Sequence, residues 1–264
     1  MRTRDILLAA LLVLVFLAPL TVLFLYALSG TWRYPALTPQ TYSLRGVLFL
    51  TRNGTAILRS LLSSVAYSVL TVVVSFAVCV LPASLLARYE FRGRIALESV
   101  FLSPVLVPAI TFAVGIHYTF IVLRLADTYV GVILVLTFFA SPYMLRALTV
   151  GFQTYSEDVD RCARNLGASL WRRLLRVHLP LLAPAVISGG TVVFLVAFSE
   201  YFLVFLIGGG AVRSFTGYLF PFLSSSDSAI GSILTLVFLV APLLLFLVID
   251  LTVIRTQRKK GVLG

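Results

Sequence analysis

Six long apolar runs constrain this chain more than any other feature of its sequence. They occupy residues 6–28, 57–87, 95–123, 128–147, 180–207 and 229–254. A helix of about 20 mostly apolar residues crosses the hydrocarbon core of a bilayer, and every run reaches that length. The sequence therefore predicts an all-α membrane protein with six transmembrane helices.

The composition agrees with a chain embedded in lipid. Apolar residues make up 60% of the sequence and charged residues only 12%, whereas soluble domains carry about 25% charged residues. The net charge is +11, but the basic residues lie in short segments between apolar runs, which argues against nucleic-acid binding. Cys79 lies in an apolar run and Cys162 in a basic loop, so we expect two free thiols and no metal site.

The positions of the basic residues also predict the orientation. If the N-terminus is cytoplasmic, most of the 21 Lys and Arg residues fall in inner segments. Cytoplasmic segments of membrane proteins are enriched in these residues, so both termini are expected in the cytoplasm. The expected parts are an uncleaved anchor helix with an outer loop at 1–56, a core at 57–254 and a basic tail at 255–264. The first run exceeds the apolar core of about 7–15 residues found in signal peptides.

The inner segment at about 149–179 carries the most information. Ser156 precedes an acidic cluster at 157–160, and the segment then becomes basic. Acidic residues first and basic residues last complement the dipole of a helix, and Ser156 is a suitable N-cap. Gly167 lies in the middle, where a glycine costs a helix about 1 kcal/mol. Gly167 therefore indicates either a break between two short helices or a close contact with another backbone.

The order of residues in this segment resembles the EAA loop of ABC-importer permeases. In that family Glu-Ala-Ala is followed by three residues, Gly, nine residues, an aliphatic residue, one further residue and Leu-Pro. The residues that match at this spacing are Ala163, Gly167, Val177, Leu179 and Pro180. Cys162 replaces the first Ala, and Arg161 replaces the Glu with a reversal of charge. Asp160 is the nearest acid, but it points about 100° away from Arg161 on a helix.

In this family the loop forms a short helix that docks in a cleft of the ATP-hydrolysing subunit. The resemblance implies a docking loop made of Asp160, Arg161, Cys162, Ala163, Asn165, Leu166, Gly167, Ala168 and Ser169. Val177, Leu179 and Pro180 would end the loop.

The resemblance extends over residues 57–254. Residues 101–108 are similar to the Pro-rich third helix of these permeases, and residues 141–143 to the stretch before the loop. Residues 197–202, with Arg213 and Asp227 nearby, resemble the branch that imports polyamines, ferric iron, thiamine or phosphonates, and sugar permeases are the next most similar. The implied architecture is the type I importer permease fold.

The resemblance implies a non-catalytic subunit in the bacterial cytoplasmic (inner) membrane. Its partners would be two ATP-binding cassette ATPase subunits, a second permease and a periplasmic or lipid-anchored solute-binding protein. A related chain is favoured over a second copy as the other permease. ATP and Mg would bind to the ATPase, and no cofactor would bind to this chain. A polyamine or similar cationic solute is favoured, with sugar, phosphonate, thiamine or ferric iron as alternatives.

Glu200, Tyr201 and His117 are candidate residues of the translocation pathway. Glu200 lies 20 positions after Pro180, or about 30 Å along a helix that rises 1.5 Å per residue, and His117 would reach a similar height on the third run. Charge within a bilayer is costly and usually faces a cavity or a partner. Glu200 therefore either lines the pathway or pairs with His117 or an interfacial Arg.

Two other classes of protein compete with this interpretation. A self-sufficient secondary transporter would show mid-plane charges and an inverted repeat. A membrane-embedded enzyme would need a paired acid or a His cluster that faces a cavity, and the two histidines, His117 and His178, are predicted far apart in depth.

Overall fold

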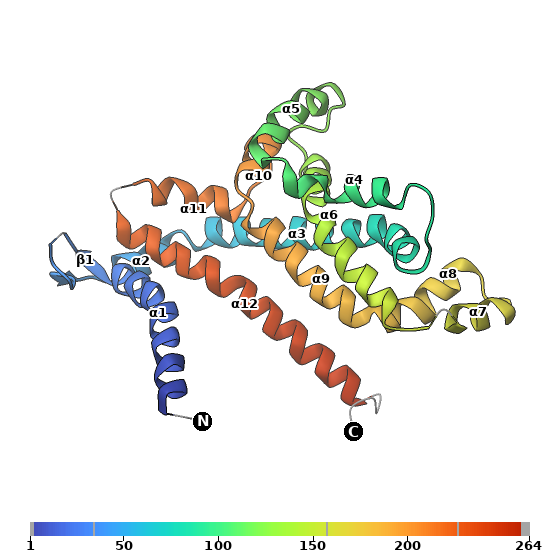
Figure 1. Cartoon of the computed structure of the whole chain (residues 1–264). Coiled ribbons are helices and arrows are strands. Elements are labelled where there is room, and N and C mark those ends of the chain that lie inside the picture. The colour runs from blue at the N-terminus through green and yellow to red at the C-terminus, as the bar shows by residue number, and fades with distance from the viewer. Residues whose placement is uncertain (1–2, 34, 157, 226, 260–264) are drawn as a thin grey trace. The chain divides into compact units, whose positions relative to one another are not determined.

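The computed structural model describes residues 3–33, 35–156, 158–225 and 227–259 (Figure 1). The chain divides into two compact units, one made of Met1–Leu61 and Phe215–Gly264, the other of Leu62–Ser214. Both are helical, and a single short antiparallel strand pair lies in the first.

The first unit is built around α12 (Ser228–Lys259). The helices α1 (Thr3–Ala27), α2 (Arg45–Arg52) and α11 (Phe215–Leu223) all pack against α12. Ile57, near the start of α3 (Gly54–Arg88), is buried with Phe215, Leu219 and Leu234 in one apolar cluster. These residues come from α3, α11 and α12, so the cluster packs N-terminal and C-terminal segments of the chain against one another within this unit.

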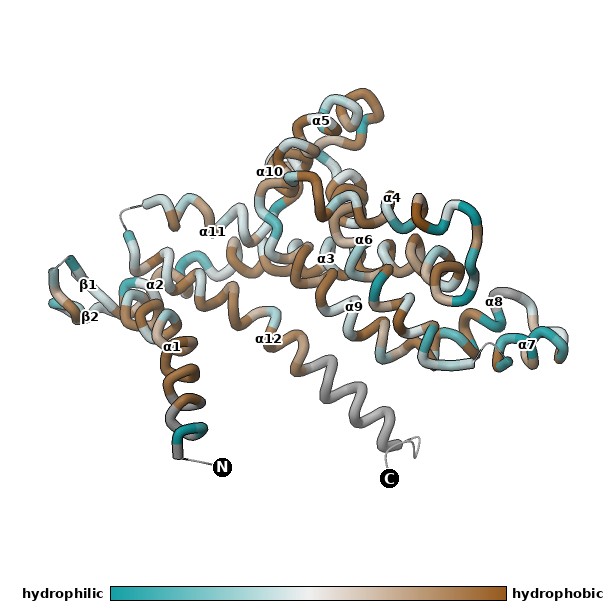
Figure 2. Tube along the Cα trace, viewed as in Figure 1, coloured by the Kyte–Doolittle hydropathy of each residue, from teal (hydrophilic) through white to brown (hydrophobic). Residues whose placement is uncertain are grey.

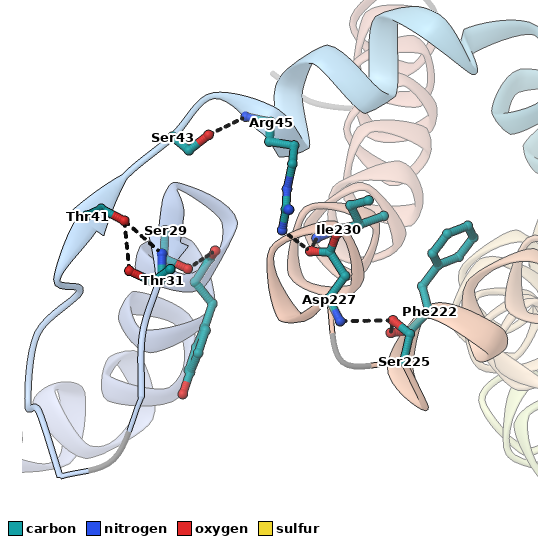
Figure 3. A network of polar contacts seen from close by, with 10 residues as sticks. Ser29, Thr31, Thr41, Ser43, Arg45, Phe222, Ser225, Asp227 and Ile230 are labelled. Atoms are coloured by element: carbon teal, nitrogen blue, oxygen red, sulfur yellow. Dashed lines mark hydrogen bonds and ion pairs between the residues drawn. The ribbon is translucent and has the colours of Figure 1, made fainter.

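The predicted outer loop of the first unit is ordered by polar contacts (Figure 3). Strands β1 (Ser29–Thr31) and β2 (Thr41–Tyr42) pair in antiparallel fashion. Arg45 Nη2 then donates to Asp227 Oδ1 at 2.7 Å, and the same oxygen accepts from the Ile230 N–H at 3.4 Å in the first turn of α12. Asp227 thus caps α12 and also connects it to the start of α2.

The second unit has α6 (Tyr129–Gln153) at its centre. It packs against α4 (Arg94–Leu106), α9 (Leu179–Ser199) and α10 (Phe202–Gly208). Small residues allow α6 and α9 to approach closely, because a Cβ on Gly151 would lie 2.6 Å from the Ala185 Cβ. A Cβ on Gly189 would likewise lie 2.7 Å from the Ala147 Cβ. Such small-residue contacts are the usual way in which helices associate in lipid.

The part of α3 in this unit buries a polar stripe along one face. Ser64, Ser68, Thr71 and Ser75 are all fully buried, at spacings of three or four residues that share one side of a helix. Cys79 continues the stripe, and its thiol donates to the Ser141 carbonyl at 3.5 Å. Cys79 is buried and Cys162 exposed, and both are free thiols, as predicted.

The predicted count of six spans is only partly reproduced. Within the described residues, four helices are long and apolar enough to cross a membrane, and a bent pair would make a fifth. The four are Gly54–Arg88, Tyr129–Gln153, Leu174–Ser199 and Ser228–Leu247. The described apolar part of α1 is the shorter stretch Leu11–Ala27.

The third apolar run, predicted as one spanning helix over residues 95–123, is not a continuous helix. It is divided into α4 and α5 (Ala109–Val122), and the two axes differ by 106°. Val107 is extended, with φ −97° and ψ 126°, because the ring of Pro108 disfavours the helical conformation of the residue before it. The height predicted for His117 assumed a continuous helix, so it is wrong as well.

The fifth helix is also broken where the sequence predicted continuity to residue 207. The helix α9 ends at Ser199, Glu200 is extended with φ −73° and ψ 120°, and α10 begins at Phe202. No proline or glycine lies at this point. The first residues of α5 and α10 contribute to the same apolar cluster, which includes Ala113 and Leu203.

Candidate functional site

The loop that resembles the docking segment folds as two short helices. The helix α7 (Asp158–Asn165) is followed by α8 (Leu170–Arg173) and by the π-helical turn η1 (Leu174–His178), which runs directly into α9. Ser156 caps α7 as predicted, because its hydroxyl accepts from the Asp158 N–H at 3.1 Å. Figure 2 shows that hydrophilic residues gather on α7, whereas α9 is mostly hydrophobic.

Gly167 ends α7 in a left-handed conformation with φ +77°. Its N–H donates to the Arg164 carbonyl at 2.9 Å, and the Ala168 N–H donates to the Ala163 carbonyl at 3.0 Å. This pair of hydrogen bonds is the Schellman motif, in which glycine is preferred because it has no Cβ. The predicted break between two short helices at Gly167 is confirmed.

Most side chains of the loop face outward. The side chain of Leu166 is 87% exposed at the turn, and Arg161, Cys162, Asn165, Gly167 and Ser169 are exposed as well. Ala163, Ala168, Val177 and Leu179 are partly buried, and Pro180 is exposed.

Asp160 is the exception, because its carboxylate points inward. Its Oδ1 lies 2.9 Å from His178 Nε2 and 3.5 Å from Arg173 Nε. The side chains of Asp160, His178 and Arg173 are only 13%, 12% and 17% exposed. The carboxylate can only accept, so His178 Nε2 donates to it, and His178 Nδ1 forms a second hydrogen bond with the Tyr155 hydroxyl at 2.9 Å.

The network continues to the end of α3. The Arg88 guanidinium carbon lies 5.2 Å from the Phe152 ring centre and 5.1 Å from that of Tyr155, which are cation–π distances. Burial raises the pKa of Tyr155 to about 12. Its hydroxyl therefore stays protonated at neutral pH and is not an activated nucleophile.

Arg161 takes no part in this inward network. Its side chain is 63% exposed and lies 4.0 Å from Asp158 in an exposed ion pair. Asp160 and Arg161 thus point in different directions, as the helical spacing predicted. Asp160, not residue 161, supplies the acid that joins the loop to the start of the fifth span.

The three candidate pathway residues lie at and near the broken helices. Glu200 Oε1 accepts from the Leu203 N–H at 3.1 Å and so caps the start of α10. The Tyr201 ring stacks on Phe205 with ring centres 5.6 Å apart. His117 lies on α5, and its Nδ1 is buried with no hydrogen-bond partner among the described residues. The proposed pair of Glu200 with His117 does not form.

Sequence reasoning did not assign roles to Arg88, Tyr155, Arg173 or His178. These residues are up to 90 positions apart, and no local spacing indicates that they meet. The described residues contain no group of three His, Cys, Asp or Glu that could hold a metal ion.

A helical membrane-spanning protein with an exposed polar loop that buried contacts hold in place is the class of protein that the fold and the site define. Comparison with known families assigns the chain within that class. The family described as "Binding-protein-dependent transport system inner membrane component" matches residues 80–258. The chain belongs to this family and is an ABC-importer permease.

Curated proteins with similar sequences are also named as permeases of transport systems. The chain is 30% identical over 122 residues to the molybdate/tungstate transport system permease protein WtpB of Thermococcus kodakarensis, which covers 46% of this chain and 49% of the relative. It is 32% identical to the probable sulfate transport system permease protein cysT of Nephroselmis olivacea, over 47% of this chain and 48% of the relative. The trehalose transport system permease protein SugB of Mycobacterium tuberculosis is 26% identical, and the match covers 70% of this chain and 69% of the relative. The chain thus spans about half the length of the first of these relatives.

A solved structure supports the fold. The crystal structure of a bacterial ABC transporter involved in the import of the acidic polysaccharide alginate contains a chain that matches with a TM-score of 0.71. The match covers 93% of this chain and 94% of that chain at 18% identity, so it is a likeness of fold. The relatives named above transport oxyanions and a sugar, and the predicted polyamine branch is not supported.

Proposed function

We propose that this chain is the membrane-spanning subunit of a binding-protein-dependent importer and that residues 158–173 dock on an ATPase partner. The observation that carries the proposal is the loop itself. It presents an exposed Leu166 outward and is fixed inward through Asp160 to His178 and Arg173. A loop held in this way can transmit a movement of its partner to the spanning helices.

A continuous helical segment would carry the movement of the loop into the membrane. The segment Leu174–Ser199 is one candidate span, and α8 leads into it without interruption. A partner that pulls on the loop therefore acts on α9, which packs along α6. We propose that closure of two ATPase subunits tilts these helices and alternately opens the pathway to each side of the membrane. ATP and Mg would be bound by the ATPase.

The remaining parts of the assembly follow from the family. We propose six spans with both termini in the cytoplasm of a bacterium, a second permease (a related chain is favoured) and an external solute-binding protein. One permease with one docking loop can engage one ATPase. A second permease supplies the second dock and the other wall of the pathway.

The broken helices are the proposed walls of the pathway. Discontinuous spanning helices expose backbone groups near the mid-plane, where transporters commonly bind solute. Here the α4–α5 and α9–α10 breaks share one apolar cluster. Glu200 lies at the second break and His117 on α5. We propose that Glu200 shapes the pathway through its cap on α10.

An inorganic oxyanion is the proposed solute. The molybdate/tungstate and sulfate relatives are 30% and 32% identical to this chain. A disaccharide is the second candidate, because the trehalose relative matches 70% of the chain. The family assignment does not decide between them.

Reconstitution tests the function. The chain, the ATPase, the second permease and the binding protein encoded beside it would be placed in proteoliposomes, and uptake of molybdate, sulfate and trehalose would be measured with and without internal ATP. We expect ATP-dependent uptake of one oxyanion. Uptake by this chain alone, driven by an ion gradient, would instead identify a secondary transporter. Uptake of trehalose alone would show that the solute is a disaccharide and not an oxyanion, and the protein would still be an ATP-driven importer.

A further inference from the structure

A cavity of about 330 Å³ is lined by residues from the end of α3, the end of α6, the helix α7 and the segment from Arg173 to His178. This volume is at the lower end of ligand pockets, which enclose about 300–1,000 Å³. Its polar wall contains Arg88, Arg164, Arg173 and Asp160. All of these elements belong to the second unit.

The cavity carries an excess of positive charge. Three guanidinium groups line it and a single carboxylate opposes them. Asp160 is already engaged by His178 at 2.9 Å and Arg173 at 3.5 Å. Arg88 and Arg164 have no ion-pair partner among the residues that the structure describes. The electrostatics of the cavity therefore favour an anion.

Unused donors lie on the same wall. Arg88 Nε and Nη2 are buried and have no hydrogen-bond partner among the described residues. Arg173 Nε is also buried without one, since its contact with Asp160 does not have hydrogen-bond geometry. The rings of Phe152 and Tyr155 hold the Arg88 guanidinium in place. Buried guanidinium donors are rarely left unsatisfied, and an anion with several oxygens is the group that suits their planar fork.

The other wall of the cavity is apolar and reaches the surface of the chain. Val80, Leu81 and Leu85 line it on α3, and Leu81 and Leu85 are 58% and 45% exposed. The helix α3 is one of the candidate spans, and acyl chains are the apolar groups that exposed leucines on a spanning helix can contact. From Leu81 to Arg88 the cavity follows about 10 Å of helix. It thus joins a cationic end to an apolar end.

We propose that this cavity binds a phosphate group, with the headgroup of an anionic phospholipid as its source. The phosphate would lie between Arg88 and Arg164, and one acyl chain would follow Leu81 and Leu85. Basic pockets between spanning helices at the headgroup level are known to hold anionic lipids. Because Arg164 belongs to α7 and Arg88 to α3, the lipid would also fasten the loop to a spanning helix.

The test uses the full chain in nanodiscs of phosphatidylcholine alone or of phosphatidylcholine mixed with phosphatidylglycerol. Thermal unfolding would be recorded in both, and lipid retained after detergent extraction would be identified by mass spectrometry. We expect phosphatidylglycerol to raise the unfolding temperature and to be retained. Both effects should be lost in Arg88→Gln and in Arg164→Gln, and the Arg164 side chain is exposed and contributes nothing to the core.

Arg92→Gln is the matched control, since Arg92 is an exposed arginine outside the cavity. It should keep both effects. A parallel titration with inorganic phosphate in phosphatidylcholine nanodiscs distinguishes the sources. Protection by phosphate alone would assign the site to a free anion, whereas protection by phosphatidylglycerol alone would assign it to lipid. If neither anion had an effect, the proposal would be overturned. The same holds if Arg92→Gln lost both effects equally, or if the retained lipid were displaced when the ATPase binds.

Discussion

At the residue scale, the Asp160 carboxylate connects the loop to the start of the fifth span. It contacts His178 and Arg173, and His178 in turn forms a hydrogen bond with Tyr155, which follows the fourth span. All of these side chains are largely buried in the described structure. A buried carboxylate that accepts from His178 and lies 3.5 Å from the Arg173 guanidinium is held more strongly than an exposed ion pair, because less water competes for it.

Replacement of Asp160 by Ala should therefore destabilise the loop. It removes a charge-assisted hydrogen bond, worth about 2 kcal/mol, and leaves Arg173 with an uncompensated charge. We expect a lower unfolding temperature and weaker retention of the ATPase. Arg161→Ala is the control, since its exposed ion pair at 4.0 Å contributes about 0.5 kcal/mol or less. A larger effect of Arg161→Ala than of Asp160→Ala would contradict this assignment.

Glu200 provides a second residue-scale prediction. Its Oε1 caps α10 through the Leu203 N–H, and a Gln at this position keeps an oxygen that can accept the same bond. Glu200→Ala should cost about 1 kcal/mol of stability, and Glu200→Gln much less, as measured by thermal unfolding in detergent. If both variants lost stability equally, the charge of Glu200 and not its cap would be the important property.

At the element scale, the termination of α7 depends on the backbone of one residue. Gly167 has φ +77°, and a Cβ at this position would meet no atom within 4 Å. Space is therefore available for a side chain, and the only cost of substitution is the left-handed conformation. The sequence indicated this break because a glycine within a helix costs about 1 kcal/mol.

The stability cost of a substitution at Gly167 should depend on how well the new residue tolerates a positive φ. Gly167→Val should cost about 1–2 kcal/mol and reduce ATPase retention, whereas Gly167→Asn should be nearly neutral, since Asn tolerates the left-handed region. Unfolding temperature and co-purified ATPase are the two readouts. Equal loss in both variants would show that the partner contacts the Gly167 backbone too closely for any side chain.

The breaks in the third and fifth spans could not be predicted from the sequence alone. Pro108 lies at a 106° bend, but Pro82, Pro104, Pro142 and Pro242 lie within continuous helices. A proline therefore does not by itself predict a break, because neighbouring helices can compensate for the lost hydrogen bond. The break at Glu200 has no local signal at all. It depends on packing between α5, α6 and α10.

At the scale of the whole molecule, the apolar runs and the loop motif predicted a polytopic permease, and membership of the family confirms it. The buried network at the loop could not be predicted, since Arg88, Tyr155 and His178 come from three separate helices or turns. The solute branch could not be predicted either. A few residues around 197–202 resemble polyamine importers, but the oxyanion and sugar relatives share much longer stretches.

The orientation can be tested with the native cysteines. Cys162 is exposed on α7 and Cys79 is buried, so one thiol reports on the loop. A membrane-impermeant maleimide should label the protein in inverted membrane vesicles but not in intact spheroplasts, because the loop is proposed to be cytoplasmic. Cys162→Ser should abolish labelling. Labelling from outside in spheroplasts would place the loop and both termini on the opposite side.

The most direct test of the docking claim concerns Leu166, whose side chain is 87% exposed at the turn after α7. The tagged chain would be purified in mild detergent with its partners, and the amount of ATPase per permease would be measured by quantitative mass spectrometry for the native chain and for Leu166→Glu. Leu37→Glu is the control, because Leu37 is 91% exposed and belongs to the other unit. We predict one ATPase per permease for the native chain and for Leu37→Glu, and loss of the ATPase with Leu166→Glu. A full complement of ATPase on the Leu166→Glu variant, or none on the native chain, would contradict the docking role of this loop.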